Sequence, residues 1–244
     1  MSSVTRFLTI SSIQTDENTD SMGNLSYSSN NYYSTRNNLT GTFRDDLSIL
    51  ASNYYLSVNS RLWYNTNCIK RTYLSFYMDG SEIEQQEYII NAKISMHLTK
   101  SYIDFGAYQE NPIFLSLNRD SEYVFHHIPI VSSDYYIGNY DLINIKSQES
   151  ISDGETGNWK NFNLTEELIN EIYNFGYFKY MVSTLMDIGR TGPEHNQTFS
   201  MEFSNYSDSS NIPILVLELI NEEYTGLIET TSGRGQKCLK LLRE

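Results

Sequence analysis

Apolar and polar residues alternate in short runs between about residues 43 and 221, and Asn, Asp, Gly and Ser separate the runs. Side chains two positions apart on a strand share a face, so this pattern predicts strands with one face toward a core. The clearest runs are RTYLSFYM (71–78), IINAKISMHL (89–98), FKYMVSTLMDI (178–188) and TFSMEFS (198–204). The run IPILVLEL (212–219) is apolar at nearly every position, which predicts a strand covered on both faces.

The alternation also predicts which side chains face the core. In the run 89–98, one face carries Ile90, Ala92, Ile94, Met96 and Leu98, and the water-facing side carries Asn91, Lys93, Ser95 and His97. One helix is expected, in NLTEELINEIYN (163–174), with Asn163 or Thr165 as its N-cap and Gly176 after its end. The predicted fold is therefore all-β, a jelly-roll-like antiparallel β-sandwich with one short helix.

The composition changes twice along the chain. Residues 1–42 are rich in Ser, Asn, Thr and Asp and predict a polar N-terminal arm, because such a segment buries too little apolar surface to fold alone. Residues 43–221 hold the strand pattern and form the predicted sandwich domain. Residues 222–244 read as a linker followed by a basic and apolar C-terminal tail, which we expect to dock on a neighbouring subunit.

The overall charge limits the range of partners. The 244 residues carry 17 basic and 30 acidic side chains, a formal net charge of −13. Duplex DNA and anionic membranes both attract basic surfaces, so nucleic acid and membrane are not expected as partners. The first twenty residues lack a long apolar run, so no signal peptide is expected, and no stretch reaches the roughly 20 apolar residues of a membrane span.

No catalytic or metal-binding pattern is recognisable in the sequence. Cys68 and Cys238 belong to no Cys-x-x-Cys pair and are expected to be free thiols. His126 and His127 are adjacent, so on a strand they face opposite sides. A structural calcium ion at Asp153 and Glu155 is the alternative left open. The expectation is a protein that is not an enzyme and has no metal or cofactor, with an esterase or lyase as the third choice.

The order of these runs resembles the DNRLRE (disaggregatase-related) β-sandwich domains. RTYLSFYMDG followed by IINAKISMHL is similar to that family's Arg-x-Tyr-Leu-x-Phe strand and the strand after it. Trp159 with NFNLTEELINEIYN, and the closing runs that end near Pro213, continue the resemblance over roughly residues 45–220. The family's Ser-Arg-Glu element is replaced by Ser-Asn-Tyr at 204–206. The resemblance implies a jelly-roll-like sandwich that acts as a non-catalytic carbohydrate-binding or adhesion module.

The Asn-, Ser- and Tyr-rich composition also resembles structural proteins of crAss-like bacteriophages. The expected function is accordingly a non-enzymatic virion structural protein, a head fibre, decoration or tail-associated subunit made in the host cytoplasm and anchored through its termini. Its expected partners are other virion proteins, itself as a homotrimer, and a glycan of the host surface. The alternative function is a carbohydrate-binding module that recognises a polysaccharide.

Two groups of residues are candidates for contact with partners. Outward aromatic rings beside hydrogen-bonding side chains suit a glycan platform; these candidates are Trp63, Asp134, Tyr135, Tyr136, Asn139, Tyr140 and Trp159. The docking candidates of the tail are Arg234, Lys237, Leu239, Lys240, Leu241, Leu242 and Arg243. The competing interpretations are that the tyrosines serve the core or an oligomer interface, and that the tail is a frayed, solvated end.

Overall fold

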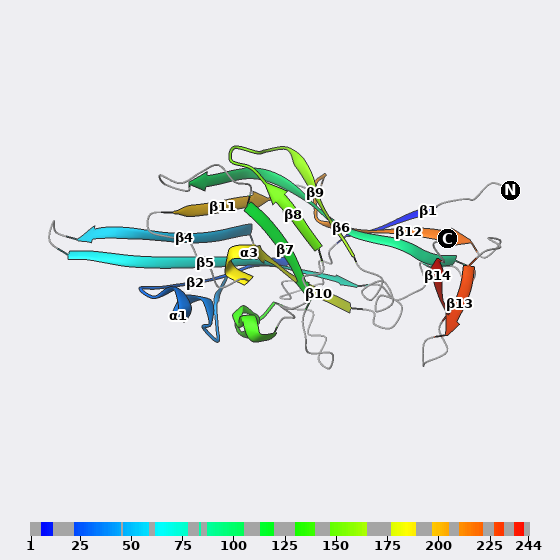
Figure 1. Ribbon diagram of the computed structural model, residues 1–244, viewed down its shortest axis with the longest axis horizontal. Helices are drawn as coiled ribbons and strands as arrows, with labels where there is room; N and C mark the ends of the chain where they lie inside the picture. The colour runs from blue at the N-terminus through cyan, green and yellow to red at the C-terminus, as the bar shows by residue number, and fades with distance from the viewer. Residues whose placement is uncertain are drawn as a thin grey trace.

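The computed structural model describes residues 6–11, 22–44, 46–58, 62–77, 83, 87–104, 113–119, 130–139, 147–164, 177–188, 197–204, 210–221, 227–231 and 237–241. Its strands are β1 (Arg6–Ser11), β2 (Met22–Ser29), β3 (Thr42–Arg44), β4 (Leu47–Val58), β5 (Leu62–Tyr77), β6 (Glu87–Asp104), β7 (Ile113–Arg119), β8 (Ser147–Ile151), β9 (Asn158–Asn163), β10 (Tyr177–Thr184), β11 (Thr198–Phe203), β12 (Ile214–Asn221), β13 (Leu227–Thr231) and β14 (Lys237–Leu241). The helices are α1 (Tyr32–Arg36) and α3 (Leu185–Ile188), with 3₁₀ turns η1 (Ser132–Tyr135) and η2 (Ile137–Asn139). The all-β, sandwich-like prediction is confirmed (Figure 1).

Strands β1–β12 form one antiparallel sheet, which divides into two layers at the long strands β5 and β6. The strand order is β1-β12-β6-β11-β4-β5-β10-β7-β8, with β9 also paired to β6 and β2 to β5. Along one edge β5 pairs with β4 over Leu62–Lys70 and with β10 over Thr72–Tyr77. In the same way β6 pairs first with β12 and then with β11. Where the partner changes, the two branches of the sheet separate and a core fills the space between them.

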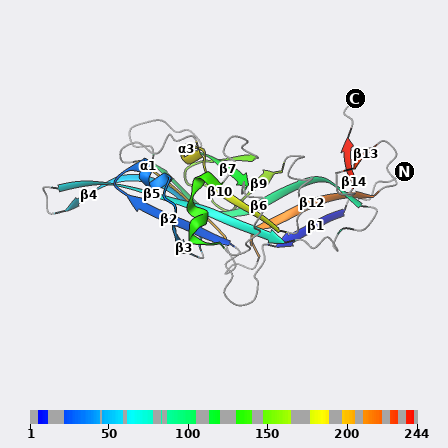
Figure 2. The same ribbon diagram turned by 90° about the horizontal axis from the view of Figure 1, so that it is seen from below.

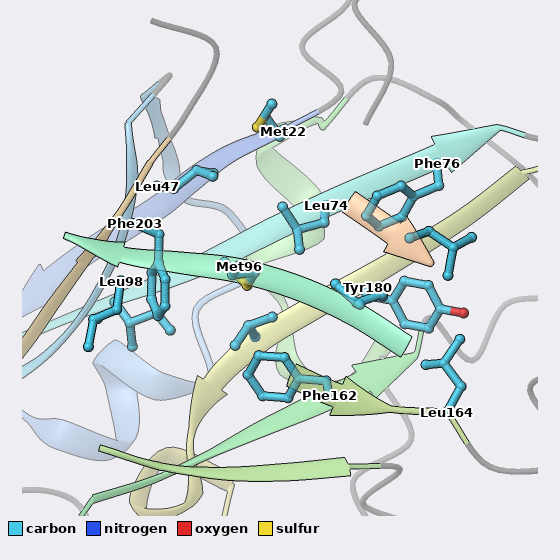
Figure 3. Packing of buried hydrophobic residues seen from close by; sticks show 14 of the residues in the cluster. Met22, Leu47, Leu74, Phe76, Met96, Leu98, Phe162, Leu164, Tyr180 and Phe203 are labelled. Atoms are coloured by element: carbon cyan, nitrogen blue, oxygen red, sulfur yellow. The ribbon is translucent and has the colours of Figure 1, made fainter. Parts of the chain in front are cut away.

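The main core takes side chains from both branches. Figure 3 shows side chains of β5, β6, β9 and β10 gathered in it, among them Leu74, Met96 and Tyr180. The predicted inward residues of β11, Phe199, Met201 and Phe203, are all buried there. Burying an apolar side chain of this size contributes roughly 1.5–3 kcal/mol, so this cluster supplies most of the driving force for folding.

The face prediction for β6 is confirmed except at its start and at Ser95, which was expected to face water but is buried and donates a hydrogen bond to Asn161 Oδ1 of β9. Ala92, Ile94, Met96 and Leu98 are buried, but Ile90 is only partly buried and Ile89 takes its place in the core. The pairing of β6 with β12 slips by one residue at this point, so Ile90 is the extra residue of a β-bulge. The prediction that β12 is covered on both faces is wrong. Its residues alternate between buried and partly buried, with Leu215, Leu217 and Leu219 inside, so the outer face is only partly covered.

The predicted N-terminal arm contributes to the sheet. Residues 22–29 form β2, which lies alongside β5, and α1 follows it (Figure 2). Met22 and Leu25 are buried, and Asn31 caps α1 by accepting a hydrogen bond from the Ser34 N–H at 3.1 Å. The sandwich therefore includes part of the segment that the composition assigned to the arm. This polar segment can fold because it packs against apolar residues that are far away in the sequence.

The predicted linker and tail form a two-stranded antiparallel sheet of β13 and β14. Four of the docking candidates lie on β14: Lys237, Leu239, Lys240 and Leu241. Arg234, Leu242 and Arg243 lie outside the described residues, as do residues 165–176, which hold most of the predicted helix. The long axis of the molecule has β1, β13 and β14 at one end and the joined ends of β4 and β5 at the other (Figure 1).

Candidate functional site

The strand registers place one row of polar side chains on the outer face of β5, β4, β11 and β6. Leu50 lies opposite Lys70 on one side and Ser200 on the other, and Ser48 lies opposite Glu202. The alternate residues of β4 and β11, such as Ile49 and Met201, point the other way into the main core. Small Ser side chains on the outer face leave space between the larger ones.

This space is an open groove of about 480 Å³. Its charged groups belong to Asp46, Glu202 and Lys70, and its hydroxyls to Ser48, Thr99, Ser200 and Ser204. Leu47, Leu50 and Phe203 supply its apolar wall. A surface that offers hydrogen-bond donors and acceptors around apolar patches is suited to a ligand that carries both kinds of group.

Hydrogen bonds from below hold part of the groove in place. Asn24 on β2 is fully buried, and its Nδ2 donates to the Asp46 carbonyl at 2.8 Å and to Ser48 Oγ at 3.2 Å. Ser48 Oγ in turn donates to Asp46 Oδ2 at 2.7 Å. On the opposite side, Thr99 Oγ1 donates to the Glu202 carbonyl at 2.9 Å. The Asp46 carboxylate is therefore positioned before any ligand arrives.

An exposed aromatic ring lies next to this groove. Trp159 on β9 pairs across the ladder with His97 on β6, and the two rings lie 5.3 Å apart between centroids. His97 Nδ1 is hydrogen-bonded to Ser204 Oγ at 3.0 Å, and Ser204 lines the groove. Trp159 remains 39% exposed. The predicted glycan residue Trp159 is thus joined to the groove through two successive contacts.

The other glycan candidates are placed differently. Asp134 and Tyr135 are buried, so the prediction that they contact a glycan from the surface is wrong. Tyr136 is 37% exposed and belongs to the same turn, between η1 and η2. Trp63 lies on β5 and Asn139 in η2, but the orientation of their side chains is not described, and Tyr140 lies outside the described residues.

Tyr135 is buried because it covers a charged centre inside the protein. The Arg71 guanidinium lies 4.5 Å from the centre of the Tyr135 ring, and the Tyr135 hydroxyl donates to the Thr35 carbonyl at 2.9 Å. Gly41 passes close by, and a Cβ there would come within 2.8 Å of the Tyr135 ring. Burial raises the pKa of Tyr135, although the nearby Arg71 opposes the rise. The ring is therefore a neutral structural element at physiological pH.

The charged centre joins four segments that are distant in sequence: α1, β5, η1 and α3. Arg71 donates from Nε to Asp187 Oδ2 at 2.6 Å and from Nη2 to Asp187 Oδ1 at 3.0 Å. The same guanidinium donates to the carbonyls of Tyr135 and Arg36, at 2.5 and 2.9 Å. Burial alone would lower the pKa of Arg71, but the Asp187 carboxylate raises it above its usual value. These groups satisfy one another, which is typical of a structural ion pair.

The loop between β8 and β9 holds the carboxylates that were considered for calcium. Asp153 Oδ1 accepts from the Ile103 N–H at 2.7 Å, and Glu155 Oε1 pairs with Lys160 Nζ at 2.5 Å. Gly154 and Gly157 turn this loop with positive φ values of 69° and 76°. Within the described ranges, no three His, Cys, Asp or Glu side chains gather closely enough to hold a metal ion, and Cys68 is a free thiol.

No protein-family model and no curated protein sequence matches this chain. The resemblance to DNRLRE domains therefore stays a prediction. In the part of the chain that the structure describes, no helix has the length and apolar character needed to cross a membrane.

The groove itself was not recognised in the sequence. Its residues stand singly at outward positions of separate strands, where Ser200 and Glu202 look like ordinary solvated side chains. The sequence feature that could have indicated the groove is the small size of successive outward residues, because Ser at such positions leaves a hollow between longer side chains.

Proposed function

We propose that the protein is a non-catalytic β-sandwich module that binds carbohydrate in the groove on the outer face of β4 and β11. The observation that supports this proposal is the position of Trp159 beside a groove of hydroxyl, carboxylate and ammonium groups. A sugar ring has an apolar face that stacks on an aromatic ring and an edge of hydroxyls that donate and accept hydrogen bonds. Both kinds of partner are present here.

The arrangement of Ser204 and His97 supports a binding role over hydrolysis. In a Ser-His-Asp triad the serine bonds to His Nε2 while Nδ1 donates to the acid. Here Nδ1 is bonded to Ser204, and the imidazole packs on Trp159. This geometry uses the histidine to hold the tryptophan and the groove edge together.

The test is affinity electrophoresis in gels that contain soluble polysaccharides, namely xylan, galactomannan, mixed-linkage β-glucan and starch. We expect one of these to retard the protein, and Trp159→Ala or Glu202→Gln to lose most of the retardation. Tyr33→Ala is the matched control, because Tyr33 is a 59% exposed ring on α1 and does not line the groove. Equal retardation of all variants, or release of reducing sugar that Ser204→Ala abolishes, would contradict the proposal.

A second candidate function is a virion structural subunit anchored through its termini, a role that the sequence predicts. The observation that favours it is the position of β1, β13 and β14 at one end of the long axis, with the β4–β5 ends at the other (Figure 1). A subunit held at the first end would project the rest outward, with other virion proteins and copies of itself as partners. Light scattering on a sizing column tests this role: a trimer that deletion of residues 222–244 converts to a folded monomer supports it, and an unchanged mass contradicts it.

A further inference from the structure

The groove and Trp159 together cover more of the surface than one sugar ring needs. From β9, which carries Trp159, the strands follow in the order β6, β11, β4 and β5, which carries Lys70. Neighbouring strands lie about 4.8 Å apart, so these four intervals amount to about 19 Å. We infer that the site binds an extended, uncharged polysaccharide chain that runs across the strands, from Trp159 to Lys70. This inference rests on the proposed function and specifies its ligand.

The groups along this path are spaced for a chain. At one end the Trp159 ring offers a stacking surface, and His97 connects it to the buried Ser204 at the edge of the groove. Glu202 on β11 is exposed near the middle, opposite the buried Ser48 of β4, whose hydroxyl already donates to Asp46. Lys70 stands on β5 at the far end, opposite Leu50. Thr99 on β6, Ser200 and Glu202 on β11 and Lys70 on β5 supply the accessible hydrogen-bonding groups, so further sugar units gain contacts until the path is filled.

The charges in the groove select against acidic sugars. Two carboxylates, Asp46 and Glu202, line it together with the ammonium group of Lys70, and the exposed Lys100 of β6 lies opposite Glu202 across the ladder. A uronic acid chain would bring a carboxylate at regular intervals, and those near Asp46 would be repelled. Neutral hydroxyls instead donate to these carboxylates in charge-assisted hydrogen bonds. The formal net charge of −13 adds a repulsion of longer range against anionic polymers.

The floor of the groove lowers the cost of binding. Because Asn24 and Ser48 already hold the Asp46 carboxylate, little side-chain freedom is lost there when a ligand binds. The part of the groove formed by β4 is thus ready for the ligand, while Lys70 has the longest free side chain and must be ordered. This predicts that the affinity gained per sugar unit is smallest at the Lys70 end.

The experiment is isothermal titration of the full chain with xylo-, cello-, manno- and malto-oligosaccharides of one to six units. With the series it prefers, we expect the affinity to rise roughly tenfold, or by about 1.4 kcal/mol, between one and four units and then to level off. Polygalacturonate and alginate should bind more weakly than neutral polymers. Trp159→Ala and Lys70→Ala should each lower the affinity for the hexasaccharide, by amounts that add in the double variant.

The outcomes separate this inference from the proposed function. Equal affinity for the monosaccharide and the hexasaccharide would overturn the inference that the site binds an extended chain, but it would leave the proposed carbohydrate binding in place. Tighter binding of polygalacturonate or alginate would overturn the selection for uncharged sugars. Absence of binding to every oligosaccharide and polysaccharide would overturn the proposed function itself. Far-ultraviolet circular dichroism of Lys70→Ala and Trp159→Ala checks that both variants are folded, and Tyr33→Ala again serves as the unaffected control.

Discussion

The buried ion pair of Arg71 and Asp187 gives the sharpest test of the fold. The change is Asp187→Asn, which keeps the size and shape of the side chain but removes its negative charge. Arg71 and Asp187 are 0% and 1% exposed, and the carboxylate also accepts from Ser183 Oγ at 2.8 Å. Without that carboxylate, the Arg71 charge remains inside the protein with only carbonyl and hydroxyl partners, and the new amide N–H₂ faces other donors.

The size of the effect follows from the burial. Removing one partner of a buried ion pair costs about 3–5 kcal/mol, because the other charge is left uncompensated. Arg36 Nε lies 3.7 Å from Asp187 Oδ1 and donates to the Asp187 carbonyl at 2.6 Å, so a second buried guanidinium loses its counter-charge. We therefore expect a loss near the upper end of this range. Domains of this kind have a free energy of unfolding of about 5–15 kcal/mol, so the variant should be severely destabilised.

The measurement is urea unfolding followed by circular dichroism. The control is Asp153→Asn, an exposed carboxylate whose hydrogen bond from the Ile103 N–H the amide oxygen still accepts; its expected effect is below about 1 kcal/mol. A second variant, Arg71→Met with Asp187→Leu, removes both charges and should recover part of the loss. If Asp187→Asn unfolds within about 1 kcal/mol of the unchanged protein, the ion pair does not hold this region together.

Two further predictions concern pH. Burial opposes the charge of Glu155, but hydrogen bonds from Lys160, Asn158 and the Ser152 N–H lower its pKa below 4.5. Its stabilising contribution is therefore present above pH 4.5 and lost as the pH falls through the lower value of the folded protein; Glu155→Gln should destabilise the protein at pH 7 and progressively less as the pH falls below 4.5, and a constant difference in the free energy of unfolding would contradict this. Burial raises the pKa of Tyr73, although Arg71 opposes the rise, so its contribution is complete below pH 10 and lost above it. Absorbance at 295 nm should show tyrosines that ionise only with the loss of circular dichroism, and complete ionisation of a folded protein near pH 10 would contradict that prediction.

The hydrophobic pattern predicted most of these strands because one buried face is enough to fix the alternation, but it extended the run 178–188 over Leu185–Ile188, which form α3. It failed at Ile90, since the pattern of one strand does not record the register of its neighbour, and the bulge depends on the pairing with β12. It also failed to anticipate that Arg71 and Tyr73 are buried. The segments that cover them, α1 and η1, are far away in sequence, so the strand alone gives no sign of a second buried face.

The candidate site was predictable only where a single residue carries the signal. An isolated Trp in a polar context marks a surface for stacking, and Trp159 is indeed exposed beside the groove. Asp134 and Tyr135 carried the same kind of signal but are buried, because Asp134 pairs with Lys179 at 2.7 Å and Tyr135 covers Arg71. Composition shows which groups are present; only the pairing of distant segments decides whether they meet a ligand or each other.

Adjacent residues of β5 belong to the outer groove and to the buried ion pair. Lys70 lines the outer groove, while Arg71, one position later, points to the opposite face and enters the buried centre. On a strand, neighbouring side chains face opposite sides, so one cation is free to meet a ligand and the next is fixed by Asp187. The buried ion pair of Arg71 and Asp187 therefore affects the groove only by holding β5 in position. A variant of Asp187 that is still folded at low temperature should bind the ligand with the affinity of the unchanged protein, because the loss of the ion pair changes the stability of the sheet and not the chemistry of its outer face.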